Sequence, residues 1–192
     1  MPIRETCSLR SVHPDQQMSE YAACAVKSAV DAALNPNICV FGSGFDSSMW
    51  AAMAEDANGH AYIFEHEPKW IKVTDKQLEP FAGFASVHQV GYDSKHDVMS
   101  TQYTPIPKPA PLPNNSCDVA VVDSPQGFIY GRGQSLQEAV RLTKAGGTIF
   151  LDDANRSGEK EIASKILREG NVCSDIKIHD TRVGFLQCTR HN

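Results

Sequence analysis

The sequence predicts a doubly wound α/β domain with a mostly parallel sheet, an antiparallel last strand and helices on both faces. Short apolar runs typical of buried strands alternate with helical runs along most of the chain. The first strand leads through a glycine turn into a helix and then into a second strand that ends on an acidic residue. Two short strand-like runs, 175–181 and 183–189, follow one another closely, which favours antiparallel pairing of the last strand.

The chain opens with a polar, proline-containing stretch that we expect to form an arm over 1–15, outside a single domain over 16–192. A first helix is predicted over about 16–34, because apolar side chains recur at helical spacing from Met18 to Ala33. The Asn-Pro-Asn segment at 35–37 ends it, since proline cannot continue a helix.

The glycine turn follows the apolar strand 38–41 and contains Gly42 and Gly44. The glycines permit backbone angles that a side chain would forbid and let a ligand approach the main chain. Ser47 is the predicted N-cap of the next helix, whose Met49, Trp50, Met53 and Ala54 share one apolar face. A turn that binds nothing remains the alternative interpretation.

The next strand, 61–64, ends at Glu65, whose carboxylate can accept hydrogen bonds from both hydroxyls of a ribose. Position 47 is serine rather than the third glycine of the dinucleotide fingerprint, so a cofactor without a pyrophosphate is the better prediction. S-adenosylmethionine fits this description. The predicted cofactor-binding residues lie in the turn and at neighbouring strand ends: Gly42, Ser43, Gly44, Asp46, Ser47, Glu65, Tyr92 and Asp123.

The second half of the chain continues the alternation. After a third strand at 85–90, the segment 101–114 carries prolines at every second position from Pro105 to Pro113 and is predicted to be an extended surface loop. The later elements are predicted in this order: a strand at 118–123, a helix at about 135–144 closed by Gly146 and Gly147, a strand at 148–151 and a helix at 159–169.

Three aspartates, Asp123, Asp152 and Asp153, follow two of these strands. Neighbouring strands lie about 4.8 Å apart, so the carboxylates are expected to converge. They could bind Mg²⁺ or Mn²⁺, act as a general base, or be structural, with Asp153 pairing with Arg156. Arg132, predicted on a flexible loop, could grip an anionic acceptor. The predicted acceptor site also includes Asn155 and Arg156 at the same strand end.

Bulk properties exclude several classes of protein. The net charge of −5 gives no basic footprint for nucleic acid, and no apolar run is long enough to span a bilayer. The six cysteines are scattered without a Cys-x-x-Cys pair, so we expect buried free thiols in a cytoplasmic protein, with neither zinc nor disulfides.

At these residues the chain resembles the plant glucuronoxylan 4-O-methyltransferase family over about Met18 to Leu167. The family's glycine motif is similar to Val40 to Ala51, and its later Asp and Gly-Arg segments resemble 122–127 and 131–132. Its motif at the end of the fifth strand resembles 150–159. The chain departs from the family pattern where Phe45 and Asp152 replace histidines and Asn155 replaces an aspartate.

The resemblance implies a Rossmann-like class I methyltransferase fold with a seven-stranded sheet, and S-adenosylmethionine as methyl donor. The leading hypothesis is an O-methyltransferase that acts on a small, acidic, uronate-like acceptor. Asp123, Asp152 and Asp153 would position and deprotonate the hydroxyl, with or without a divalent ion. An N-methyltransferase of a small metabolite and a non-catalytic S-adenosylmethionine-binding protein are the alternatives. The sequence makes no prediction of oligomeric state.

Overall fold

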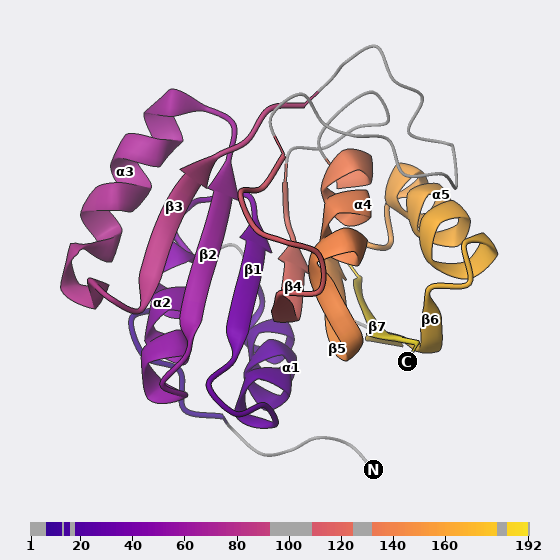
Figure 1. Cartoon of the computed structure of the whole chain (residues 1–192), viewed down its shortest axis with the longest axis horizontal. Coiled ribbons are helices and arrows are strands. Elements are labelled where there is room, and N and C mark those ends of the chain that lie inside the picture. Colours follow the sequence, from indigo (N-terminus) through magenta and orange to yellow (C-terminus); the bar gives the residue numbers. More distant parts are fainter. Residues whose placement is uncertain are drawn as a thin grey trace.

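A computed structural model describes residues 7–12, 14–15, 18–92, 109–124, 132–179 and 184–191. Its seven-stranded sheet has the order β3-β2-β1-β4-β5-β7-β6 (Figure 1). The strands are β1 (Asn37–Phe41), β2 (His60–Glu65), β3 (Ala85–Gln89), β4 (Cys117–Val122), β5 (Thr143–Asp152), β6 (Cys173–His179) and β7 (Phe185–Arg190). Strands β1 to β5 pair in parallel, whereas β7 is antiparallel to both of its neighbours, β5 and β6. The predicted fold class is confirmed.

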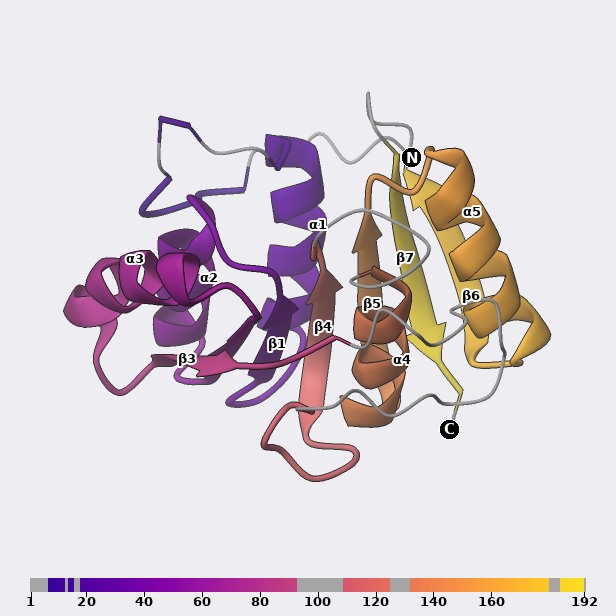
Figure 2. The ribbon, with the colours of Figure 1, turned by 90° about the horizontal axis from the view of Figure 1, so that it is seen from above.

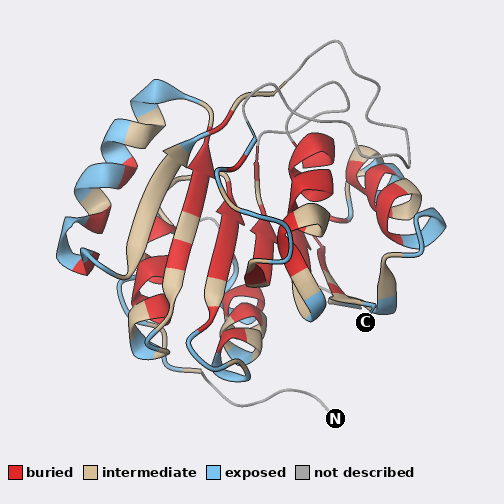
Figure 3. Cartoon of the chain, in the orientation of Figure 1, coloured by how far each residue is buried: buried red, intermediate tan, exposed pale blue. Residues whose placement is uncertain are grey.

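Helices cover both faces of the sheet, and Figure 2 shows α1 and α4 on opposite sides of it. One apolar core lies between the sheet and α1 and α2, and a second lies between the sheet and α4 and α5. The central strands are therefore buried on both faces (Figure 3), which explains their continuous apolar sequences. The helices are α1 (Glu20–Asp31), α2 (Ser47–Asp56), α3 (Pro68–Leu78), the 3₁₀ turn η1 (Glu79–Phe81), α4 (Arg132–Leu142), α5 (Ser157–Ala163) and its π-helical continuation η2 (Ser164–Glu169).

Several helix ends differ from the sequence prediction: α1 is shorter than the predicted 16–34, and α2 and α4 differ as follows. The N-cap of α2 is Asp46, and Ser47 is the first helical residue, with its Oγ accepting a hydrogen bond from the Gly44 N–H at 3.1 Å. Helix α4 ends at Leu142 rather than at the glycine pair, because the chain enters β5 directly and Thr143 pairs with Cys117. Gly147 belongs to that strand, where an added Cβ would lie 2.8 Å from the Asp118 carbonyl oxygen.

The prediction of free thiols is wrong. Disulfides join Cys7 to Cys24, Cys39 to Cys117, and Cys173 to Cys188, and no cysteine among the described residues is free. Two of the bridges join neighbouring strands, β1 to β4 and β6 to β7. Sequence spacing does not reveal these pairs because the sheet brings together cysteines that lie 15 and 78 residues apart. Such bridges stabilise a fold mainly by restricting the unfolded chain.

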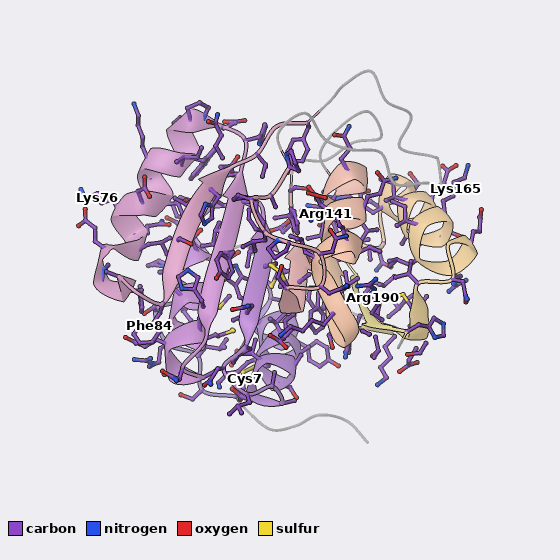
Figure 4. The ribbon with its side chains drawn as sticks, viewed as in Figure 1. Cys7, Lys76, Phe84, Arg141, Lys165 and Arg190 are labelled. Atoms are coloured by element: carbon purple, nitrogen blue, oxygen red, sulfur yellow. A yellow bond between two sulfur atoms is a disulfide. The ribbon has the colours of Figure 1, made fainter. Side chains whose placement is uncertain are left out.

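The described part of the N-terminal arm packs against the domain. Cys7, labelled in Figure 4, is bridged to α1, and Arg10 forms ion pairs with Glu55 and Asp56 of α2. The Ser48 hydroxyl donates a hydrogen bond to the Ser11 carbonyl at 3.0 Å. Within the described ranges, no helix has both the length and the apolar character needed to cross a bilayer.

Candidate active site

A cleft of about 680 Å³ lies at the carboxyl ends of β1, β2, β4 and β5. In an open α/β sheet this edge is where ligands bind. The glycine turn and the end of β2 contribute one part of its wall, and the acidic ends of β4 and β5 contribute another. The lining residues used below are Gly42, Ser43, Gly44, Phe45, Asp46, Ser47, Glu65, His66, Glu67, Trp70, Asp123, Arg132, Asp152, Asp153 and Arg156.

The two glycines of the turn have different roles. Gly42 has φ +104°, and a Cβ there would lie 2.3 Å from the Asp123 carbonyl oxygen. This glycine therefore lets the turn pack closely against the end of β4. A Cβ on Gly44 would meet no described atom within 4 Å, so this position leaves open space in the cleft.

Glu65 is buried and ties the end of β2 to the glycine turn. Its Oε2 accepts hydrogen bonds from the Ser43 N–H at 2.9 Å and the Ser43 hydroxyl at 2.7 Å. Its Oε1 accepts from the N–H groups of His66 at 2.6 Å and Glu67 at 2.8 Å. The carboxylate is held in one orientation at the wall of the cleft, next to the turn that the sequence predicts to bind the cofactor.

The predicted convergence of three aspartates is present. One carboxylate oxygen from each of Asp123, Asp152 and Asp153 lies within 4.8 Å of the others. Arg132 reaches into this cluster: its Nη2 donates to Asp123 Oδ1 at 2.7 Å, and its Nη1 donates to Asp153 Oδ2 at 2.9 Å. The acidic cluster therefore contains its own counter-charge.

Burial raises the pKa of Asp123 to about 7, although the guanidinium of Arg132 acts in the opposite direction. Burial, followed by the charge of Asp153, also raises the pKa of Asp152. A carboxyl group with a pKa near neutrality can exchange a proton with a substrate at physiological pH. Asp123 thus has the ionisation expected of a general base.

Asp153 is held from several sides. It is a buried non-glycine residue with φ 56°, in the left-handed region that such residues rarely occupy. Besides Arg132, its Oδ2 contacts Arg156 Nη1 at 2.6 Å. This is the ion pair that the structural interpretation of Asp153 predicted. Arg156 nevertheless keeps 40% of its side chain exposed and lines the cleft.

Two aromatic residues of the cleft were missed as site residues. Phe45 and Trp70 meet edge to face, with ring centroids 5.9 Å apart. Both rings belong to the lining of the cleft. Trp70 follows the proline that starts α3 by two residues, so the first turn of a helix brings it to the cleft. The sequence signal for this position was that Pro68, which starts α3, follows the predicted site residue Glu65 by three positions.

Some predicted site residues do not join the cleft. Tyr92 packs against the core on the α4 side and accepts a hydrogen bond from the Ser135 hydroxyl at 2.9 Å, and its burial raises its pKa to about 12. Asn155 is exposed and packs against Gly184. Neither is among the described residues that line the cleft.

Arg132, predicted on a flexible loop, instead begins α4 and is 3% exposed. The segments 125–127 and 101–108 lie outside the described residues.

No protein-family model matches the chain. Curated relatives are nevertheless found among plant O-methyltransferases of Arabidopsis thaliana. The chain is 26% identical over 184 residues to glucuronoxylan 4-O-methyltransferase 3 and 29% identical over 189 residues to glucuronoxylan 4-O-methyltransferase 1, and each match covers 83% of the chain. It is 26% identical over 167 residues, 69% of the chain, to arabinogalactan O-methyltransferase 2. The matches span 61%, 64% and 55% of the lengths of these three relatives.

Solved structures with the same fold include O-methyltransferases. The O-methyltransferase TomG from Streptomyces achromogenes, solved with S-adenosylmethionine, matches with a TM-score of 0.60 and 15% identity over 93% of this chain and 83% of that one. A SAM-dependent O-methyltransferase from Thermotoga maritima matches with a TM-score of 0.64 and 12% identity over 92% of this chain and 67% of that one. The chain therefore has the fold of Rossmann-like O-methyltransferases, and its sequence makes it a relative of the plant glucuronoxylan 4-O-methyltransferases, as its motifs indicated.

Proposed function

We propose that the chain is an S-adenosylmethionine-dependent O-methyltransferase that methylates a hydroxyl of an acidic saccharide. The observation that carries the proposal is the composition of one cleft: a glycine turn and a buried glutamate on one part of its wall, and an acidic cluster on another. The O-methyltransferase names of the relatives, and the S-adenosylmethionine bound to a structural neighbour, support the same reaction.

Gly42, Ser43, Gly44 and Glu65 would hold the cofactor, since a ribose hydroxyl can take the place of the Ser43 hydroxyl on Glu65 Oε2 and Gly44 leaves room for a ligand. Bound S-adenosylmethionine would supply an activated methyl group. The task left to the protein is to orient the acceptor hydroxyl and accept its proton, and Asp123 suits this task because its pKa is raised to about 7.

The acceptor class follows from the other lining residues. Arg156, whose side chain is 40% exposed and lines the cleft, can pair with a uronate carboxylate. The aromatic pair of Phe45 and Trp70 gives an apolar surface against which a sugar ring can pack. The names of the relatives point to a uronate-bearing polysaccharide as the acceptor, so we extend the prediction of a small acidic acceptor to a uronate unit within a saccharide chain.

The proposal is tested by titration calorimetry with S-adenosylhomocysteine and by mass spectrometry of products. Acceptors would be a glucuronate-bearing xylan oligosaccharide, free glucuronate and a neutral xylan oligosaccharide of equal length. We expect cofactor binding and a methyl ether on the first acceptor, weaker turnover of the second and none of the third. Methylation on nitrogen in an amine panel would favour the N-methyltransferase alternative, and cofactor binding without turnover of any acceptor would favour a non-catalytic protein.

A further inference from the structure

We infer that Arg132 is a built-in cation of the acidic cluster: it holds Asp123 and Asp153 in position and occupies the place that a divalent metal ion would need. The role in metal exclusion follows from the geometry alone. The role in catalysis, as a positioning residue, rests on the proposed function.

The guanidinium of Arg132 bridges the ends of two neighbouring strands. At the end of β4 it binds Asp123 Oδ1, and its Nε donates to the Ser124 carbonyl at 2.9 Å. At the end of β5 its Nη1 donates to Asp153 Oδ2 and to the Asp152 carbonyl, both at 2.9 Å. Four hydrogen bonds in a buried site fix the planar group, so it fixes the carboxylates in turn.

The same geometry argues against an acceptor-binding role for Arg132. Its side chain is 3% exposed, and its hydrogen bonds to Asp123 and Asp153 already use the groups that would grip an acceptor carboxylate. Arg156 is the better candidate for that role, because 40% of its side chain is exposed in the same cleft. The site thus divides its two arginines between an internal and an acceptor-facing position.

The three carboxylates would otherwise suit a divalent ion, since hard cations prefer several carboxylate oxygens. Here one oxygen of Asp123 and one of Asp153 are already in ion pairs with Arg132, and Arg156 adds a second positive charge at Asp153. A divalent ion among these oxygens would lie beside a buried guanidinium and be repelled by it. The residues present therefore do not fit a metal site while Arg132 is in place.

The first test is binding of Mn²⁺ alone, followed by electron paramagnetic resonance and by calorimetry, with no methyl donor or acceptor present. Wild type and Arg132→Lys are expected to bind Mn²⁺ only weakly, because both keep a positive charge there. Arg132→Gln should bind Mn²⁺ at least about tenfold more tightly, since it removes the positive charge that Arg132 places between Asp123 and Asp153 and leaves Arg156 as the cation at Asp153. Arg141→Gln is the matched control, because Arg141 lies on the same helix (Figure 4) but pairs with Glu138 and does not line the cleft.

Stoichiometric Mn²⁺ binding by the wild type, abolished by Asp152→Asn, would overturn the inference whether or not methyl transfer is ever detected. Equal Mn²⁺ affinity in folded Arg132→Gln and Arg141→Gln would also overturn it. Removal of a buried ionic partner can prevent folding. If Arg132→Gln does not fold, the wild-type measurement still decides whether a metal binds there.

The second test measures the positioning role in the active enzyme. Arg132→Lys should lower kcat and displace the pH profile of kcat, with little change in the KM of the acceptor, because the lysine keeps the charge but cannot bridge both carboxylates. Arg156→Gln should instead raise the acceptor KM. A rise in acceptor KM with unchanged kcat in Arg132→Lys would return Arg132 to the acceptor-binding role.

Discussion

The substitution Glu65→Gln probes the connection between β2 and the glycine turn. The carboxylate accepts four hydrogen bonds, two on each oxygen, and each oxygen serves at least one backbone N–H. A glutamine keeps the shape but has one acceptor oxygen and one NH₂ group. In either orientation of the amide, the NH₂ group would face a backbone N–H of Ser43 or those of His66 and Glu67, leaving a buried donor without its acceptor.

The magnitude follows from these contacts. Hydrogen bonds to a charged group contribute about 1.5–3 kcal/mol each, and the serine hydroxyl can rotate to accept from the amide, so the expected loss is about 2–4 kcal/mol of unfolding free energy. For a domain of this size that corresponds to a fall in Tm of about 5–15 °C. Affinity for S-adenosylhomocysteine should fall about tenfold or more, because the turn loses its anchor and the ribose loses a charged acceptor.

The assay is thermal unfolding followed by circular dichroism, with calorimetric titration of S-adenosylhomocysteine on the same samples. Glu67→Gln is the control: it also removes one negative charge, two residues further along the chain, but from a side chain that is 53% exposed. It should change the free energy of unfolding by less than about 0.5 kcal/mol. If Glu65→Gln unfolds at the same temperature as Glu67→Gln, the anchoring role is refuted. If it is destabilised but binds S-adenosylhomocysteine as the wild type does, the ribose role is refuted.

Three further predictions concern the same cleft and the core. Gly42→Ala should prevent cofactor binding and lower Tm, because its Cβ would collide with the Asp123 backbone, whereas Gly44→Ala should leave Tm unchanged; equal Tm values in a thermal scan would contradict this. The rate should rise with pH through about 7 as Asp123 ionises. The free energy of unfolding should fall as the pH rises from 3.8 to about 7, because Asp123 keeps a proton in the folded state that it has lost in the unfolded state. Asp123→Asn should remove both trends in pH-rate and urea-unfolding series. Opening the Cys39–Cys117 bridge with Cys39→Ser and Cys117→Ser should cost about 4 kcal/mol in urea unfolding, given a 78-residue separation, and no loss would contradict the chain-entropy estimate.

The sequence was sufficient for the sheet because its signals were local. Each signal lies within one short stretch of chain: the apolar run of β1 is followed directly by the glycine turn, and β2, β4 and β5 each end in or next to an acidic residue. Parallel strands bring these ends to one edge, so the rule for open sheets predicted the cleft and its acids. The cofactor and catalytic roles given to those residues remain predictions.

The long-range features could not be read from local pattern. Arg132 is flanked by glycines, which favoured a loop, but tertiary ion pairs with Asp123 and Asp153 bury it at the start of α4. Nor did spacing indicate that Cys39 meets Cys117, because their partnership depends on the pairing of β1 with β4. In both cases the deciding interaction joins residues from different elements of the sheet edge or core.

The three disulfides have a consequence for the cellular compartment in which the protein would be stable. Glutathione and thioredoxin keep sulfur pairs reduced in the cytosol, whereas structural disulfides persist in secretory and extracellular spaces. A chain whose arm, central strands and closing hairpin are each cross-linked is suited to such a space. We therefore expect residence along the secretory route instead of in the cytoplasm, a location in which saccharide chains under construction would be accessible to the cleft. The test is mass spectrometry of peptides from protein that is isolated without reductant and then alkylated. Disulfide-linked, unalkylated cysteines would support this expectation, whereas alkylation of all six cysteines would support a cytosolic location.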